Sequence, residues 1–92
     1  MRITDKQETL DMAVDLMCAS GKINDTEAYR KQVYLREEES TTGIGEGIAI
    51  PHGKGDCVSK PGLAAMVIKN GVDFDSLDGE PVTLLFLIAA PN

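Results

Sequence analysis

The sequence of 92 residues contains one histidine, His52, and this is the residue best suited to covalent chemistry. Pro51 precedes it, and Gly53 and Lys54 follow it. An unperturbed imidazole is partly neutral near pH 7, so one ring nitrogen can act as a nucleophile when an acceptor fixes the other. A solvated loop histidine without a role is the alternative, and composition alone favours it. The stiff run at 48–51 favours chemistry, because it would hold the ring while neighbouring glycines leave space for a phosphoryl group or a partner. Among these glycines, Gly53 is a candidate for binding the phosphoryl group or the partner.

Phosphoryl transfer fits such a histidine, because it needs little beyond a nucleophile, positioning and compensation of charge on the phosphoryl oxygens. Arg36 is the candidate for that compensation, since its planar guanidinium matches phosphate and only a short loop separates it from His52. The alternative for Arg36 is an exposed partner of the neighbouring glutamates. Three hydroxyls could also contact phosphate, although such runs are more often ordinary loop and capping residues: Ser40, Thr41 and Thr42.

Other common functional motifs do not fit the sequence. A P-loop would need a glycine where Ile48 stands and a serine or threonine where Gly55 stands. The glycine-rich run at 43–47 lacks the dinucleotide-binding spacing. His52 and Cys57 lack the paired Cys/His spacing of a structural zinc site. We therefore expect neither a metal nor a cofactor.

Composition predicts one folded domain over residues 1–92, with 42% hydrophobic and 26% charged residues. The formal net charge of −6 argues against nucleic acid and anionic membranes as partners. The longest apolar run, at 82–90, is well short of the roughly 20 residues of a membrane-spanning helix. Acidic residues in the first twenty positions do not fit a secretory signal, so we expect a cytoplasmic protein with free thiols.

Hydrophobic periodicity predicts a helix over Glu8–Ser20 and a second over Asp25–Glu38, the latter opened by a capping box at Asn24. Glu37 is expected to be solvated. After a glycine-rich loop at 41–47, the sequence predicts a short strand that Pro51 ends, which places His52 just beyond it.

Two longer strands follow in the prediction. The first covers Leu63–Ile68 and turns at Asn70-Gly71 into a short return strand. After a turn at Asp78-Gly79, the second covers Val82–Ala89 and has the pattern of a strand buried on both faces. The expected fold class is therefore α/β, with a mixed β-sheet flanked by helices.

The segment from Arg36 to Lys54, REEESTTGIGEGIAIPHGK, closely resembles the phosphorylation-site segment of IIA domains of the fructose/mannitol class (type 2). These domains belong to the bacterial sugar phosphotransferase system. The resemblance covers most of the chain, is strongest to the fructose branch and extends through PGLA at 61–64, VDF at 72–74, GEPV at 79–82 and LFLIAAP at 85–91.

This resemblance implies the mannitol-type IIA fold. It implies that His52 is phosphorylated by the phosphocarrier protein HPr and passes the phosphoryl group to a cysteine of a IIB domain, which phosphorylates the incoming sugar. Arg36 matches the arginine that the family places beside the phosphohistidine. The chain is thereby identified as a transferase component without a cofactor.

Family members carry an additional N-terminal segment and continue beyond the AAP sequence into a segment with a second active-site histidine. We therefore expect this chain to be a shortened IIA domain, incomplete at its C-terminus. Part of the Val82–Ala89 surface should then be uncovered, which favours a homodimer through an exposed strand. Two alternatives to the transport carrier are a regulatory module of the nitrogen-related branch and an inactive remnant.

Overall fold

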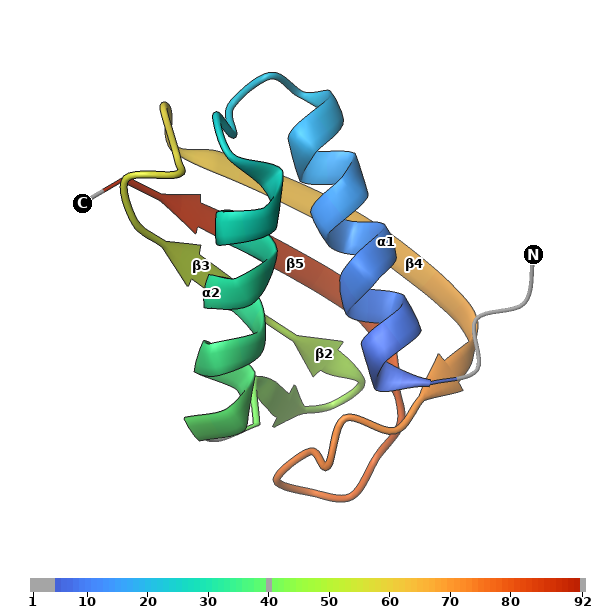
Figure 1. Cartoon of the computed structure of the whole chain (residues 1–92). Coiled ribbons are helices and arrows are strands. Elements are labelled where there is room, and N and C mark those ends of the chain that lie inside the picture. The colour runs from blue at the N-terminus through green and yellow to red at the C-terminus, as the bar shows by residue number, and fades with distance from the viewer. Residues whose placement is uncertain (1–4, 40, 92) are drawn as a thin grey trace.

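The computed structural model of the protein describes residues 5–39 and 41–91. Two helices precede five strands, with the bounds α1 (Lys6–Ala19), α2 (Thr26–Glu39), β1 (Gly43–Gly45), β2 (Ile48–Ala49), β3 (His52–Lys54), β4 (Gly62–Val72) and β5 (Val82–Ala90). Both helices lie on one face of the sheet (Figure 1). The strands form one sheet with parallel and antiparallel pairs, which confirms the predicted α/β fold class.

Strand β5 is the centre of the sheet and pairs with three other strands. It runs antiparallel to β4 and parallel to both β2 and β3. Ile48 pairs with Leu84 and His52 pairs with Ile88, so β2 and β3 keep the same register along β5. The two short strands are therefore one strand interrupted at residues 50 and 51.

This interruption corrects the prediction that Pro51 ends the strand and leaves His52 beyond it. Proline cannot donate a hydrogen bond, but its carbonyl still accepts one, here from the Ile88 N–H at 2.9 Å. The ladder resumes at His52, which is the first residue of β3. The backbone of His52 is thus part of the sheet.

The predicted loop at 41–47 contains a strand. Residues 43–45 form β1, which pairs antiparallel with β2. Glu46 and Gly47 connect the two strands with positive φ angles of 57° and 79°, the backbone of a tight hairpin turn. Asp78 accepts hydrogen bonds from the N–H groups of Glu46 at 2.8 Å and Glu80 at 3.0 Å, and these two bonds lower the pKa of its carboxyl group.

The predicted hairpin at Asn70-Gly71 is wrong. Both residues lie inside β4, where the register against β5 shifts between Val67 and Val72 and Gly71 has a φ of 73°. The nine-residue β5 provides a partner beyond the shift, since Val72 pairs with Val82. The Asn-Gly pair therefore makes a bulge-like irregularity, and the chain stays on the sheet.

Both helices are capped by aspartates at their N-termini. Asp5 accepts from the Glu8 N–H at 2.7 Å and opens α1 two residues before the predicted start. Asp25 accepts from the Ala28 N–H at 3.2 Å, so the predicted cap at Asn24 is displaced by one residue. Asn24 instead donates from its side-chain amide to the Asp56 carbonyl at 2.9 Å, tying the start of α2 to the loop after β3.

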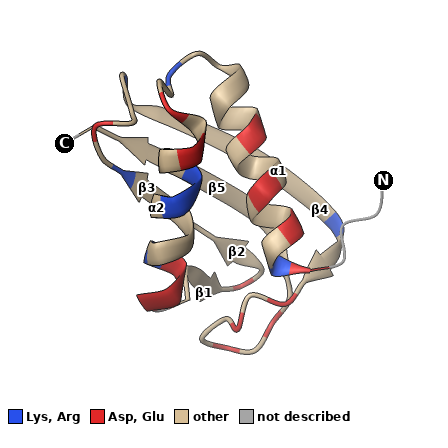
Figure 2. Cartoon of the chain, viewed as in Figure 1, with Lys and Arg blue, Asp and Glu red and all other residues tan. Residues whose placement is uncertain are grey.

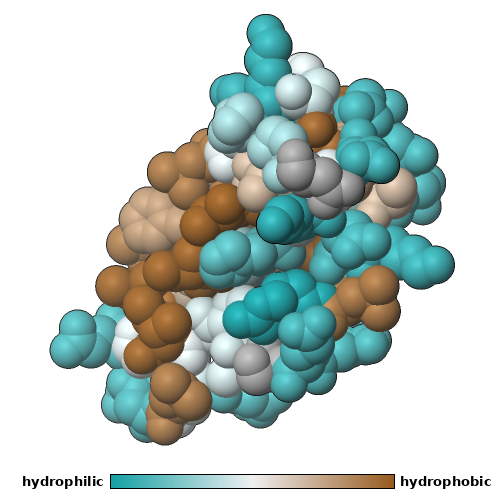
Figure 3. All heavy atoms as spheres, turned by 90° about the vertical axis from the view of Figure 1, so that its left-hand side faces the viewer, coloured by the Kyte–Doolittle hydropathy of each residue, from teal (hydrophilic) through white to brown (hydrophobic). Residues whose placement is uncertain are grey.

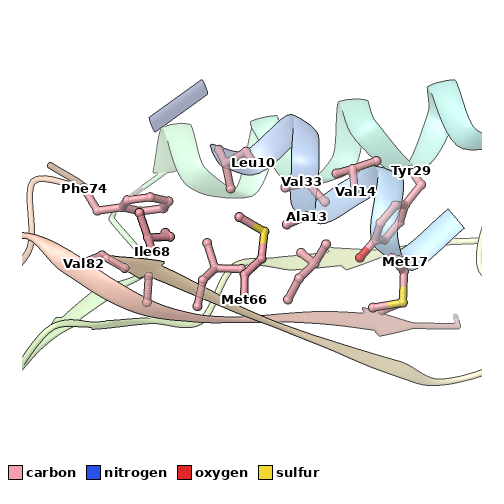
Figure 4. Close-up of a cluster of buried hydrophobic side chains, with 14 of the residues drawn as sticks. Leu10, Ala13, Val14, Met17, Tyr29, Val33, Met66, Ile68, Phe74 and Val82 are labelled. Carbon is pink, nitrogen blue, oxygen red and sulfur yellow. The ribbon is translucent and has the colours of Figure 1, made fainter. Parts of the chain in front are cut away.

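The hydrophobic core lies between the helices and the sheet (Figure 4). The predicted apolar face of α1 is confirmed, and β4 and β5 supply the opposite wall; the buried apolar residues of the two helices are Leu10, Ala13, Val14, Met17, Tyr29 and Val33. Tyr29 is fully buried and donates from its hydroxyl to the Ile88 carbonyl at 3.1 Å. This bond fastens α2 to β5 at the residue that pairs with His52.

The outer face of the sheet carries no helix in the described part of the chain (Figure 1). Along β5, buried residues alternate with half-buried Leu84, Phe86 and Ile88, so burial on both faces is wrong for this strand. On β4, Leu63 and Val67 are 64% and 72% exposed. Figure 3 shows hydrophobic atoms gathered along one margin of the molecule. A partly uncovered apolar surface was expected here.

Gly53 allows α2 to pack closely on β3. A Cβ atom at Gly53 would lie 2.4 Å from Cε1 of Tyr29 and 2.9 Å from Cγ2 of Val33, both fully buried. We expect Gly53→Ala to lower the free energy of unfolding by about 1–3 kcal/mol, because α2 would have to move away from β3. Urea denaturation measures this loss. Gly79→Ala is the control, since no atom lies within 4 Å and only its φ of 75° is unfavourable; equal stability of wild type and Gly53→Ala would refute the packing role.

Candidate functional site

A pocket of about 270 Å³ is lined by residues of α2 and β3. Its described lining combines four residues of α2 and two of β3: Gln32, Leu35, Arg36, Glu39, His52 and Lys54. The α2 residues recur at the spacing of one helix face. His52 and Lys54 are two residues apart in a strand, so they leave the same side of β3. The structure therefore brings the two main sequence candidates, His52 and Arg36, to one pocket.

The imidazole of His52 is positioned by the backbone of β3, which pairs with β5. The residue is half-buried, and its Nδ1 atom is buried without a hydrogen-bond partner among residues 5–39 and 41–91. The expected acceptor for one ring nitrogen is thus not found in this part of the chain. The enclosure of Nδ1 leaves Nε2 as the candidate ring atom for chemistry.

Arg36 lies half-buried in the last turn of α2, where a cation interacts favourably with the helix dipole. The next residue, Glu37, anchors that turn. Its carboxylate accepts from the Thr42 N–H at 2.9 Å and the Thr42 hydroxyl at 2.5 Å, and it pairs with Lys6 at 2.9 Å. These contacts join the end of α2 to the chain entering β1 and to the start of α1, and so fix the helix turn that carries Arg36.

The expectation that Glu37 is solvated is wrong, since its side chain is only 6% exposed. Tyr29, Val33 and Glu37 are spaced four residues apart, which places all three on the buried face of α2. The helix period was therefore the signal that could have identified Glu37. The run of three glutamates concealed it, because Glu38 and Glu39 are exposed.

The hydroxyls of Thr41 and Thr42 have other partners. Thr41 donates to the Phe74 carbonyl and accepts from the Gly43 N–H at 3.0 Å, while buried Thr42 donates to Glu37. Neither threonine is among the described residues of the pocket, nor is Gly53, which packs beneath α2. The third hydroxyl candidate, Ser40, lies outside the described residues.

Removal of the Glu37 carboxylate should loosen the end of α2. We expect Glu37→Leu to lower the free energy of unfolding by roughly 2–4 kcal/mol, because the Thr42 N–H and hydroxyl would lose their acceptor in a buried position. Glu38→Leu makes the same change at an exposed neighbour and should alter stability by less than about 0.5 kcal/mol. Urea denaturation compares the two, and similar losses in both would disprove the anchoring role.

Sequence reasoning missed two pocket residues with charge, Lys54 and Glu39. The signals were the strand period, which relates Lys54 to His52, and the helix period, which relates Glu39 to Arg36. Figure 2 shows acidic residues along α1 and at the C-terminal end of α2, and basic residues on α2 and β3. The pocket is therefore lined by two basic side chains, Arg36 and Lys54, and by the only imidazole of the chain.

The described residues provide neither a metal-binding cluster nor a membrane-spanning helix. Within residues 5–39 and 41–91, no group of three or more His, Cys, Asp or Glu side chains could hold a metal ion. Neither of the two described helices has the length and apolar character needed to cross a membrane. Cys57 is a buried free thiol whose pKa is raised by burial, which disfavours a reactive thiolate.

A mixed-sheet domain with a histidine and an arginine at one pocket is the arrangement expected from the family resemblance. Residues 1–92 match the family model described as "Phosphoenolpyruvate-dependent sugar phosphotransferase system, EIIA 2". The chain therefore belongs to this family, which confirms the resemblance to type 2 IIA domains.

Three similar proteins illustrate the relationship. The fructose-specific EIIABC component of the phosphotransferase system from Bacillus subtilis is 48% identical over 86 residues, which are 94% of this chain and 14% of that protein. The crystal structure of nitrogen regulatory protein IIA-Ntr from Neisseria meningitidis matches with a TM-score of 0.89 and 29% identity, over 100% of this chain and 62% of that one. Enzyme IIA for mannitol, in complex with phosphorylated enzyme IIB from Escherichia coli, matches with a TM-score of 0.88 and 28% identity, over 100% and 65% of the respective chains. The chain thus spans less than two thirds of each relative.

Proposed function

We propose that this chain is a phosphoryl carrier of the sugar phosphotransferase system, which accepts a phosphoryl group from HPr on His52 and passes it to a IIB domain. The observation that supports this most strongly is that His52 and Arg36 line the same pocket in a chain of this family. The proposed nucleophile is Nε2, since Nδ1 is buried. The Nε2–P bond forms as the bond between phosphorus and the donor breaks.

The proposed role of Arg36 is electrostatic. Charge accumulates on the three equatorial oxygens of a phosphoryl group in transfer, and a guanidinium can hold two of them with parallel hydrogen bonds. The anchored end of α2 supports this role, because it would hold the guanidinium at the pocket that His52 also lines before the donor arrives, so that little reorganisation is needed during transfer.

The proposed partners follow from the relatives. A IIA enzyme of this fold has been solved with a phosphorylated IIB enzyme, which supports IIB as the recipient. The Bacillus subtilis relative is fructose-specific, so we propose fructose as the sugar served. HPr as the donor, and the cytoplasm as the place of the reaction, belong to the same proposal.

A reconstituted phosphoryl relay tests this function. The purified chain is incubated with phosphoenolpyruvate, enzyme I and HPr, and its intact mass is measured before and after addition of a fructose IIB domain. We expect the mass of one phosphoryl group to appear and then to move to the IIB domain. A natively folded chain that takes no label would contradict the proposal and support the inactive remnant.

A regulatory role is the second candidate, supported by the similarity to the nitrogen regulatory protein of Neisseria meningitidis. A regulator would signal its phosphorylation state to proteins other than a transporter. The same relay separates the two functions, since a regulator takes the label from HPr and keeps it when the IIB domain is added. Rapid discharge to IIB would exclude this second candidate.

We also propose that the outer face of the sheet forms a homodimer interface. Leu63 pairs with Ile88 and Val67 pairs with Leu84 across β4 and β5, so exposed side chains of β4 and half-buried side chains of β5 form one apolar surface. We expect sedimentation velocity to show an association that increases with protein concentration. Val67→Lys should shift the protein to monomer, whereas Leu16→Lys, the same kind of change at a 49% exposed position of α1 on the helix side of the sheet, should not; a wild-type monomer at all concentrations would refute the dimer.

A further inference from the structure

We infer that Lys54 is a second phosphate-binding cation, which contacts the phosphoryl group at His52 together with Arg36. The inference rests on the proposed function and extends it to a residue that neither the motif nor the chemistry of arginine singles out. Lys54 is the last residue of β3 and lines the same pocket as His52 and Arg36. Its backbone is fixed by pairing with Ala90 of β5.

The directions of the side chains support this assignment. Successive strand residues point to opposite faces, so His52 and Lys54 share one side of β3 while Gly53 faces Tyr29 and Val33. The position of Lys54 relative to the imidazole is therefore set by two residues of regular strand. A lysine stem is long and flexible, so its ammonium can follow a phosphoryl group that moves between donor and acceptor.

The charges of the pocket give a second reason. Arg36 and Lys54 are the cations of the described lining, and Glu39 is its anion. A phosphoryl group brings about −1.5 to −2 charges near pH 7. Without Lys54, the charges of Arg36 and Glu39 would cancel before the phosphoryl group arrived. With Lys54 the lining is net positive, although the whole chain has a net charge of −6.

The two cations differ in exposure and therefore in role. Arg36 is half-buried on an anchored helix turn, whereas Lys54 is exposed. Arg36 can hold oxygens with a fixed fork, and Lys54 can meet the phosphoryl group while it is still bound to the donor. The Nε2–P bond forms and the donor–P bond breaks without a proton passing through the ammonium group of Lys54.

The test compares phosphoryl transfer from phospho-HPr to wild type, Lys54→Met, Lys54→Arg and Lys60→Met. We expect Lys54→Met to accept the group roughly tenfold more slowly, as loss of a hydrogen bond to a charged group would produce. Lys54→Arg should stay within about threefold of wild type, because it keeps the charge. Lys60→Met removes the same charge from an exposed position outside the described lining and should transfer at the wild-type rate.

Two further measurements separate charge compensation from a structural role. The transfer rate of Lys54→Met should depend less on salt than that of wild type, since one screened attraction is gone. Glu39→Gln should accelerate transfer, whereas Lys54→Met slows it, because Glu39→Gln removes the negative charge from the pocket lining. Urea denaturation should give the same stability for Lys54→Met and Lys60→Met.

The outcomes are distinguishable. If wild type is phosphorylated and Lys54→Met matches Lys60→Met in rate and salt dependence, the role of Lys54 is refuted while the proposed function stands. A slow Lys54→Met that Lys54→Arg does not rescue would also refute charge compensation. Absence of any label on wild type would refute the proposed function, and the role of Lys54 with it.

Discussion

Replacing His52 with glutamine is expected to abolish phosphoryl transfer and to leave the fold intact. An amide does not replace imidazole as a nucleophile, so the rate of labelling from phospho-HPr should fall by more than about 10³-fold. The β3–β5 ladder uses backbone groups and does not depend on the ring. Stopped-flow or quenched-flow transfer kinetics measure the loss.

Stability provides the control for this variant. His52 is half-buried and its Nδ1 has no hydrogen-bond partner in the described chain, so His52→Gln should change the free energy of unfolding by less than about 1 kcal/mol. A folded His52→Gln variant that still gains one phosphoryl group at the wild-type rate would contradict the proposal that His52 is the nucleophile.

Replacing Arg36 with methionine should slow transfer by about 10²–10³-fold, the typical loss when one preorganised donor to a developing charge is removed. Methionine keeps a long apolar stem and a good helix propensity, so α2 should persist. Arg36→Lys should recover only part of the rate, because an ammonium lacks the planar fork. The measurement is the single-turnover rate from phospho-HPr.

Two comparisons serve as controls for this prediction. Lys31→Met removes a cation from an exposed position of α2 outside the described pocket lining, and it should transfer as wild type does. If the transfer rate of Arg36→Met is within twofold of the wild-type rate, the guanidinium does not contact the phosphoryl group. Equal rates for Arg36→Lys and wild type would show that charge alone, without the fork, is sufficient.

The parts of the fold that follow from local periodicity could be predicted from the sequence. The apolar stripe of α1 and the buried Tyr29 and Val33 of α2 both obey the helix period. The prediction of a turn at Asn70-Gly71 was wrong because the local turn preference competes with pairing to a long neighbouring strand. That strand, β5, lies ten or more residues further along the chain. The continuation of the strand at His52 could not be predicted for the same reason, since it depends on pairing with β5.

The candidate site could also be predicted only in part from the sequence. His52 and Arg36 could be identified from residue chemistry and a specific motif, and the structure places both at one pocket. The hydroxyls of Thr41 and Thr42 could not be assigned from sequence, because their partners depend on the tertiary fold: the Phe74 carbonyl is far along the chain, and Glu37 faces inward only through the helix phase. Lys54 was overlooked although its strand position relates it directly to His52.

The proposed function is tested most directly by locating the phosphoryl group on the labelled chain. After incubation with phosphoenolpyruvate, enzyme I and HPr, the protein is kept alkaline, digested and fragmented in a mass spectrometer, and the modified residue is read from the fragment masses. We expect a single phosphoryl group on His52. Modification of a threonine or of Cys57, with an unmodified His52, would contradict it.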